Sequence, residues 1–440
     1  MKLLFISLGC DKNLVDSEHM IAMISEDGIQ LTNDETEADV IVVNSCCFIS
    51  DAMEESIQTL IDMGRLKETA SLKYLIVTGC LAERYAKEIH EQLPEVDAVI
   101  GTNSYDEIVN TIHQLSEGKN GDVKKPLVNL PDNYAGRTLT TGGHYAHLKI
   151  AEGCDKHCTY CVIPSIRGGY RSVPMEKLLG EATILAKSGV QELILVAQEI
   201  TLYGVDIYGK KSLPELLTKL SEIEGIRWIR LQYCYPEEIT DELIDTMAHN
   251  PKICHYIDIP IQHANDWILG RMGRKTSSAD IKNIVSSLRK AMPDIAIRTT
   301  LICGFPGETE DMHRETMDFV KEMKFDRLGC FAYSRQEGTP AAEFDDQVEE
   351  ETKNLWVSEI MELQQEISAE CNRSFEGVVV DAMIEGKVAD DNVYVGRTFR
   401  DAPDVDGLVF IETGAELMTG DFVKVKITGS YEYDLIGELE

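Results

Sequence analysis

Six short apolar segments, separated by stretches with helical periodicity, occupy the middle of this 440-residue chain. These segments are residues 145–150, 192–196, 227–232, 256–259, 295–302 and 327–332. Strands that alternate with helices are typical of a parallel α/β sheet. Such repeats predict a parallel barrel of the TIM type, in which chemistry takes place at the carboxyl ends of the strands.

The N-terminal region shows the same alternation on a smaller scale. Strands are expected at residues 2–8, 40–44, 74–78 and 96–100, with helices that begin near Leu14, Asp51 and Leu81. This pattern predicts a flavodoxin-like α/β domain over residues 1–117, and the polar loop 118–132 marks a boundary. A core domain is then expected over residues 140–369.

The C-terminal region changes character after a long acidic helical stretch, residues 348–369. Short alternating strands, such as 378–384 and 422–427, predict a small antiparallel β-barrel over residues 372–440. This segment holds 6 Lys or Arg and 15 Asp or Glu, a net charge of -9. That balance argues against a surface that binds nucleic-acid phosphates and favours a basic protein partner.

Whole-chain composition narrows the class of protein. A hydrophobic content of 43% is that of an ordinary globular protein, and no membrane span is expected. The start, MKLLFISLGC, mimics a lipoprotein signal, but its apolar stretch is short and an acidic helix follows, so a first strand that ends in a cysteine is expected. Twelve cysteines are too dilute for a disulfide scaffold, which favours reduced thiols and a cytoplasmic protein.

Three cysteines form a CxxxCxxC pattern directly after the first strand of the middle region. Cys154, Cys158 and Cys161 can hold three corners of a four-iron, four-sulfur (4Fe-4S) cluster, which leaves one iron open for catalysis. A structural zinc site is an alternative, although it normally closes with four ligands, and His157 between two cysteines is a strained fourth ligand. A disulfide is the other alternative, which a reducing compartment disfavours.

A second set of cysteines follows the first three strands of the N-terminal domain. Cys10, Cys46 and Cys80 each lie just past a strand's carboxyl end, the edge at which doubly wound sheets build their sites. A single buried cysteine is usually a small hydrophobic residue, but three at equivalent positions predict convergence. Cys47 is the expected spare, because neighbouring residues at a strand end point in different directions.

The cysteine motifs resemble those of a known family. CxxxCxxC with Tyr160 before its last cysteine is similar to the radical S-adenosylmethionine (SAM) superfamily, and GCDKNLVDSE, NSCCFI and TGCLAERY resemble the N-terminal domain of its methylthiotransferases. The C-terminal segment resembles a TRAM domain. The resemblance implies a partial (βα)6 barrel of the TIM type, which matches the count of six strands. It also implies two 4Fe-4S clusters with SAM as cosubstrate. One cluster, on Cys154, Cys158 and Cys161, would cleave SAM to a 5′-deoxyadenosyl radical, and the other would lie on Cys10, Cys46 and Cys80.

SAM contacts are expected from the strand ends that face the cluster loop. The candidates are Gln198 and Glu199 after the second strand, Gln262 and His263 after the fourth, and Gly304, Gly307 and Glu308 after the fifth. The glycines would let the backbone approach a ligand, although a plain turn also explains them. The stretch AQEITLYG departs from the family pattern after the second strand. No catalytic side chain is assigned beyond the cluster ligands.

Several stretches distinguish between branches of the methylthiotransferases. Tyr235-Pro236, DIPIQHAND, FAYSRQEGTPA and GRTFRDAPDVDG resemble the branch that modifies a ribosomal protein. The resemblance implies methylthiolation of the β-carbon of an aspartate in small-subunit ribosomal protein twelve, with a reduced electron donor such as flavodoxin. Alternatives are a tRNA methylthiotransferase, acting on the hypermodified adenosine beside the anticodon, and a non-catalytic iron-sulfur carrier.

The acidic C-terminal barrel is expected to capture the basic substrate. In the loop 396–407, Asp401, Asp404 and Asp406 would contribute to a negatively charged docking surface. Truncation before Asn372 would then leave both clusters intact and weaken only substrate capture.

Overall fold

The computed structural model of the chain describes residues 1–131, 136–389 and 392–440. Two compact units make up the fold. Unit 1 comprises Met1–Thr140, Ala151–Val173 and Gln336–Thr339, and unit 2 comprises Thr141–Ile150, Pro174–Arg335 and Pro340–Glu440. The end of the predicted boundary loop, Asp132, lies outside the described residues. The domain limits drawn from the sequence stay a prediction.

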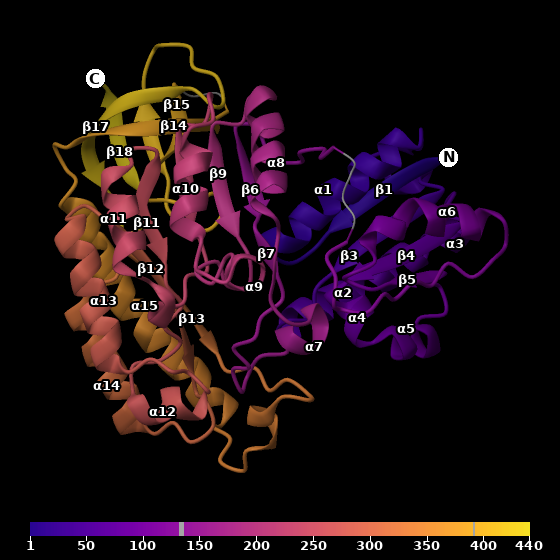
Figure 1. Cartoon of the computed structure of the whole chain (residues 1–440), viewed down its shortest axis with the longest axis horizontal. Coiled ribbons are helices and arrows are strands. Elements are labelled where there is room, and N and C mark those ends of the chain that lie inside the picture. Colours follow the sequence, from indigo (N-terminus) through magenta and orange to yellow (C-terminus); the bar gives the residue numbers. More distant parts are fainter. Residues whose placement is uncertain (132–135, 390–391) are drawn as a thin grey trace. The chain divides into compact units, whose positions relative to one another are not determined.

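Unit 1 contains a five-stranded parallel sheet in the order β2-β1-β3-β4-β5, which confirms the flavodoxin-like prediction (Figure 1). Its strands are β1 (Lys2–Ser7), β2 (Gln30–Leu31), β3 (Val40–Ser45), β4 (Tyr74–Gly79) and β5 (Ala98–Ile100). Its helices are α1 (Asp11–Glu26), α2 (Ser50–Gly64), α3 (Leu66–Thr69), α4 (Cys80–Arg84), α5 (Ala86–Gln92) and α6 (Ile108–Ser116). The sequence pattern missed β2, because this edge strand is two residues long and exposed.

Both faces of the unit 1 sheet are buried. Ile41 and Val77 pack with Leu60 on one face, whereas Val42 packs with Met20 on the other. Burial on both sides explains why β3 and β4 read as continuous apolar runs rather than as alternating patterns.

The segment with the CxxxCxxC pattern belongs to unit 1 by its packing. Strands β7 (Ala151–Glu152) and β8 (Arg171–Ser172) pair in antiparallel fashion and close its base. Helix α7 (Ile163–Arg167) follows the last cysteine. Ile166 and the preceding Val162 are buried in the same apolar cluster as Leu81, so this segment shares a core with the N-terminal sheet.

Unit 2 contains a six-stranded parallel sheet in the order β13-β12-β11-β10-β9-β6 (Figure 1). Its strands are β6 (Tyr145–Lys149), β9 (Glu192–Val196), β10 (Trp228–Leu231), β11 (Ile253–Asp258), β12 (Ala296–Cys303) and β13 (Arg327–Ala332). Since β6 and β13 are the two edges, the sheet is open, which confirms the predicted partial barrel.

Helices connect the strands of unit 2 (Figure 1). They are α8 (Met175–Lys187), α9 (Val205–Tyr208), α10 (Leu213–Ser221), α11 (Asp241–His249), α12 (Asp266–Arg271), α13 (Ser278–Ala291), α14 (Glu310–Met323) and α15 (Glu350–Arg373). The last of them is the predicted acidic helix, and it packs against β13. Among the described residues, no helix has the length and apolar character that crossing a membrane requires.

The C-terminal strands close into a small barrel in the order β14-β15-β16-β18-β17. These strands are β14 (Val379–Lys387), β15 (Val393–Thr398), β16 (Val409–Glu412), β17 (Phe422–Ser430) and β18 (Leu435–Leu439). The barrel is not antiparallel throughout, because β16 and β18 pair in parallel. Figure 1 shows the barrel in yellow beside the ends of β6 and β9, where Gln191 Nε2 donates to the Gly420 carbonyl at 2.7 Å.

The prediction that the loop 396–407 presents three aspartates as a docking surface is wrong for two of them. Asp401 is 1% exposed and accepts a hydrogen bond from Arg327 at 2.6 Å. Asp406 accepts from the Tyr256 hydroxyl at 2.7 Å, and burial raises its pKa. Only Asp404 is exposed. Asp401 and Asp406 thus accept hydrogen bonds from buried side chains of the six-stranded sheet. The loop therefore holds the barrel against the sheet and does not form a solvated acidic patch.

A buried charge cluster joins the same two elements. Glu192 accepts from Arg230 Nε at 2.7 Å and from Arg397 Nη2 at 2.8 Å, and all three side chains are almost completely buried. Burial by itself would raise the pKa of Glu192, but the charges of Arg397 and Arg230 lower it to about 2. The β-barrel therefore neutralises a charge in the sheet, which makes it an integral part of unit 2.

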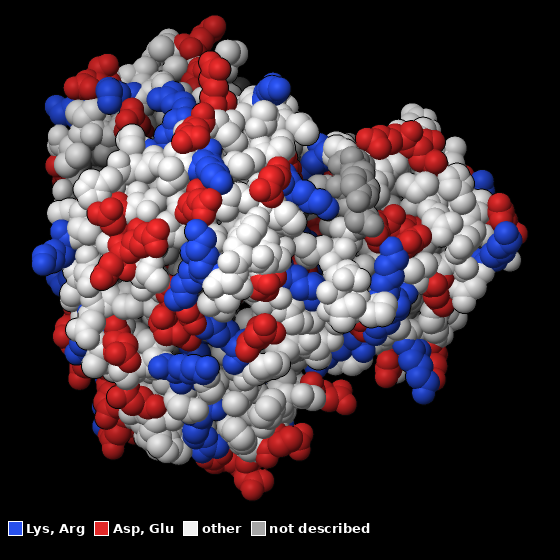
Figure 2. Space-filling model, viewed as in Figure 1, with Lys and Arg blue, Asp and Glu red and all other residues white. Residues whose placement is uncertain are grey.

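Acidic side chains, in contrast, are widely distributed at the surface. Figure 2 shows them over the whole visible face with Lys and Arg between them. On that face the acidic side chains are not gathered in one patch.

Candidate active site

The side chain of Asn13, in the first turn of α1, connects the loops that carry the N-terminal cysteines. Its Nδ2 donates to the carbonyls of Leu8 and Ser45, each at 3.0 Å. Its Oδ1 lies 4.0 Å from Cys80 Sγ. One fully buried amide thus ties together the ends of β1, β3 and β4.

Cys10, Cys46 and Cys80 follow these three strand ends. Cys10 precedes α1, Cys46 follows β3, and Cys80 is the first residue of α4. A Cβ on Gly9 would lie only 3.0 Å from Cys46 Sγ, so the glycine, with φ at +89°, lets the first loop approach the second cysteine closely. The carboxyl edge of the sheet therefore brings the three cysteines into one region.

Cys46 and Cys80 are buried, whereas Cys10 is half-buried. Burial raises the pKa of Cys46, and it raises the pKa of Cys80 to about 12 against the opposing charge of Arg167. Three thiol donors that follow adjacent strand ends are the ligands that iron-sulfur clusters take, so the donor set fits such a cluster.

Cys47 follows Cys46 and shares an apolar cluster with Cys80. It is fully buried in the apolar cluster with Leu60 and Leu81, and its carbonyl accepts from Arg84 at 3.4 Å. Burial raises its pKa to about 11. Cys47 is thus placed as a core residue.

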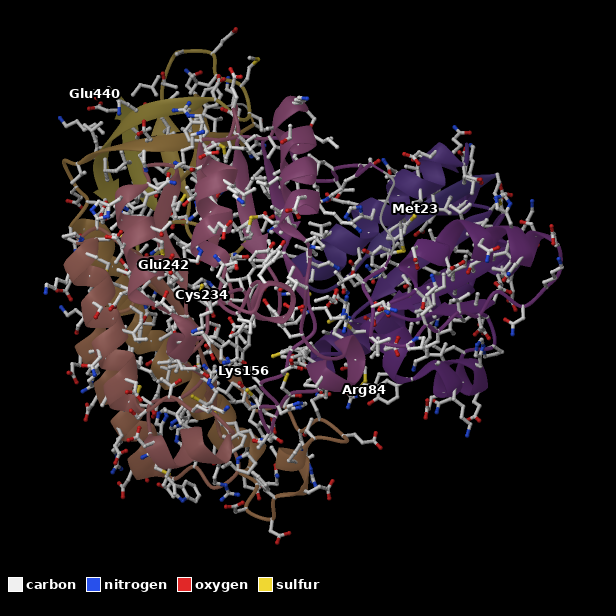
Figure 3. The ribbon with its side chains drawn as sticks, viewed as in Figure 1. Met23, Arg84, Lys156, Cys234, Glu242 and Glu440 are labelled. Carbon is white, nitrogen blue, oxygen red and sulfur yellow. The ribbon has the colours of Figure 1, made fainter. Side chains whose placement is uncertain are left out.

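Hydrogen bonds within the CxxxCxxC loop hold its backbone; Lys156 of this loop is labelled in Figure 3. The Lys156 amide donates to Cys154 Sγ at 3.5 Å, and the Cys161 amide donates to the Cys158 carbonyl at 3.0 Å. His157 adopts a φ of +50°, a conformation that non-glycine residues rarely adopt. Burial raises the pKa of Cys161 to about 12.

None of the twelve cysteines forms a disulfide. Within residues 1–131, 136–389 and 392–440, no three His, Cys, Asp or Glu side chains are placed to share a single metal ion.

The predicted SAM contacts all lie at the carboxyl ends of unit 2 strands. Gln198 and Glu199 follow β9, and Glu199 is fully buried with its Oε1 accepting from the Thr201 amide at 2.7 Å. Gln262, after β11, has a φ of +70°, and its side-chain oxygen has no hydrogen-bond partner among the described residues. These positions are consistent with a site at this edge, and their role stays a prediction.

Three of the predicted contacts lie together, although only Gly304 and Glu308 form a hydrogen bond. His263 Nε2 lies 3.1 Å from Glu308 Oε1, and Glu308 Oε2 accepts from the Gly304 amide at 2.6 Å. The structure therefore places Glu308 as the group that shapes the loop after β12. Gly304 and Gly307 are explained by packing, because a Cβ would overlap Lys353 at Gly304 and would lie 2.6 Å from Asp346 at Gly307.

Three polar residues at these sites were not predicted from the sequence. Asn13 belongs to the quoted GCDKN motif, and Arg167 lies six residues after the last cysteine of CxxxCxxC. Gln232 follows β10, is 4% exposed, and its side-chain oxygen lacks a partner among the described residues. The only sequence signal for these residues is their place next to a cysteine or a strand end.

Comparisons with known proteins agree with this organisation. Three family models match the chain: an uncharacterized protein family, UPF0004, at residues 2–101, the radical SAM superfamily at 148–320, and the TRAM domain at 377–439. The ribosomal protein uS12 methylthiotransferase RimO of Lachnoclostridium phytofermentans is 57% identical over 440 residues, which covers 100% of both chains. This chain belongs to the RimO family. It is a radical-SAM methylthiotransferase, and its family uses SAM and an iron-sulfur cluster.

Other RimO proteins are similar over the same length. The protein of Thermoanaerobacter sp. is 48% identical and covers 98% of both chains, and that of Clostridioides difficile is 46% identical and covers 100% of this chain and 99% of its own. Among solved structures, the radical SAM methyltransferase TsrM from Kitasatospora setae has a TM-score of 0.57 at 12% identity, covering 90% of this chain and 77% of that chain. This likeness supports the radical-SAM fold of the RimO-family chain.

Proposed function

We propose that this chain places a methylthio group on the β-carbon of an aspartate in ribosomal protein uS12. The observation that carries the proposal is the 57% identity over the full chain to a protein named for this substrate. The net charge of -9 between Asn372 and Glu440 is compatible with a basic protein partner, and it disfavours a phosphate backbone.

We further propose two 4Fe-4S clusters, one held by Cys154, Cys158 and Cys161 and one by Cys10, Cys46 and Cys80. The N-terminal cysteines each follow a strand end at one edge of a parallel sheet, and the other three lie in one short loop, which supports the assignment. When bound, SAM and the clusters supply a carbon radical that removes a hydrogen atom from an unactivated carbon, and the methylthio group that replaces it.

The chain's own residues position these groups. Asn13 sets the spacing of the N-terminal cysteine loops, and the strands β7 and β8 close the loop of the CxxxCxxC cysteines. Glu308 fixes the backbone of the loop after β12, one of the loops that would bind SAM. We propose Gln198, Glu199, Gln262, His263, Gly304, Gly307 and Glu308 as the SAM-binding positions, and a reduced protein such as flavodoxin as the electron donor.

Mass spectrometry of ribosomal proteins and tRNA, from cells with and without this chain, tests the substrate. A methylthio mass on an aspartate of uS12 that depends on the chain is the expected result. A methylthio mass on tRNA alone would instead assign the chain to adenosine modification, and SAM that stays uncleaved by the purified, reconstituted protein would indicate an iron-sulfur carrier.

A further inference from the structure

Arg167 is a buried arginine that reaches the N-terminal cysteines from the segment after CxxxCxxC. Its Nη1 donates to Asp16 at 2.9 Å and to Glu152 at 3.1 Å. Its Nη2 donates to Asn13 Oδ1 and, at 3.6 Å, to the sulfur of Cys80. The Arg167 side chain is only 2% exposed, so these contacts define its environment.

A buried guanidinium is retained only when its charge is paired and its N–H groups find acceptors. Asp16 and Glu152 already compensate the charge, since two carboxylates face one arginine. The contact with Cys80 Sγ is therefore not needed to neutralise Arg167. It directs a charged donor at one sulfur of the proposed N-terminal cluster.

We propose that Arg167 is a positioning residue that donates an N–H to the Cys80 sulfur and thereby favours the reduced state of the cluster on Cys10, Cys46 and Cys80. This inference rests on the proposed function, which places that cluster. Hydrogen bonds to sulfur and local charge are two of the factors that set the reduction potential of such clusters. One-electron reduction adds a negative charge, which the adjacent guanidinium stabilises.

The same contact links the two cysteine loops. Arg167 ends α7, which follows the CxxxCxxC loop, while Asn13 receives its N–H and in turn holds Leu8 and Ser45. The segment that would carry the CxxxCxxC cluster thus contributes a hydrogen-bond donor to the proposed N-terminal cluster.

The test uses the full chain with Cys158→Ala, so that only the N-terminal cluster is reconstituted. Its iron content is measured first, and its midpoint potential is then measured by anaerobic redox titration with EPR detection. The informative variant is Arg167→Gln combined with Glu152→Gln, because one positive and one negative charge are removed together and the local net charge is kept. Any change in potential then reports the loss of the directed donor.

We expect this double variant to disfavour reduction at least about tenfold, which is about 59 mV for a one-electron couple. Arg167→Lys keeps the charge and a donor, so its midpoint potential should lie close to that of the parent protein. This variant also tests the proposal if the double variant folds poorly. Arg84→Gln is the matched control. Arg84 belongs to the helix that Cys80 begins, is labelled in Figure 3, and donates to Gln336 Oε1 at 2.9 Å, so its removal should leave the potential unchanged.

The outcomes separate the two proposals. A cluster that is present with the same potential in the double variant and in the parent protein overturns the role of Arg167 and leaves the proposed function standing. If Cys158→Ala retains no iron, the assignment of an N-terminal cluster fails and the role of Arg167 fails with it. A change of equal size in Arg84→Gln would show a general charge effect and would also overturn the proposal.

Discussion

The buried carboxylate of Glu192 offers a direct test of how the β-barrel is held to the six-stranded sheet. Glu192 is 0% exposed at the start of β9, and both Arg230 and Arg397 donate to it. Glu192→Gln keeps the shape of the side chain and removes its charge. Two buried guanidinium groups would then lose the carboxylate they share.

The pKa of Glu192 gives the expected magnitude. Its decrease from 4.5 to about 2 corresponds to about 3 kcal/mol, at about 1.36 kcal/mol for each pKa unit. Loss of one partner from a buried ion pair generally costs about 3 to 5 kcal/mol, which agrees with this value. We therefore expect Glu192→Gln to lower the free energy of unfolding of unit 2 by about 3 kcal/mol.

Urea unfolding followed by tryptophan fluorescence measures this change. All three tryptophans, Trp228, Trp267 and Trp356, lie in unit 2, so the signal reports that unit. Glu215→Gln is the control, because Glu215 is exposed and water and salt screen its ion pairs with Lys219 at 3.0 Å and Lys210 at 3.1 Å.

The pH dependence has a defined sign. Because folding lowers the pKa of Glu192, its contribution to the free energy of unfolding is complete above pH 4.5. This contribution is lost as the pH falls towards about 2. The difference between wild type and Glu192→Gln should therefore shrink over that range. A cost at neutral pH no larger than that of the surface control would refute the reasoning.

Three further predictions follow from the proposed sites. Cys158→Ala should abolish reductive SAM cleavage, whereas Cys46→Ala should keep cleavage and lose methylthiolation, and each variant should lose about half of the iron; a folded Cys46→Ala protein that no longer cleaves SAM would contradict this division. Truncation before Asn372 should unfold unit 2, because buried charged residues at the amino ends of its strands would lose their ion-pair partners in the barrel. Tryptophan fluorescence measures this unfolding. A truncated protein that stays folded and cleaves SAM would argue against an integral barrel. Glu308→Gln should weaken SAM binding about tenfold in calorimetry, about 1.4 kcal/mol, because the carboxylate holds the Gly304 amide; an unchanged affinity would place SAM away from this loop.

Sequence alone determined the elements and the positions of the cysteines. The six strands of unit 2 and the four long strands of unit 1 lie close to their predicted positions, because continuous apolar runs report burial on both faces of a parallel sheet. Cys10, Cys46 and Cys80 come together because parallel strands present their carboxyl ends at one edge. Periodicity and spacing along the chain are sufficient for both inferences.

Only the tertiary structure decided which charges are buried and what they bind. Asp401 and Asp406 look like surface residues in an acidic segment, yet they pair with groups of the six-stranded sheet far away in sequence. Arg167 and Cys80 are 87 residues apart, and no local pattern predicts that one donates to the other. Pairing between distant charges depends on how elements pack, and burial then makes each pair strong, because water no longer competes for the same donors and acceptors.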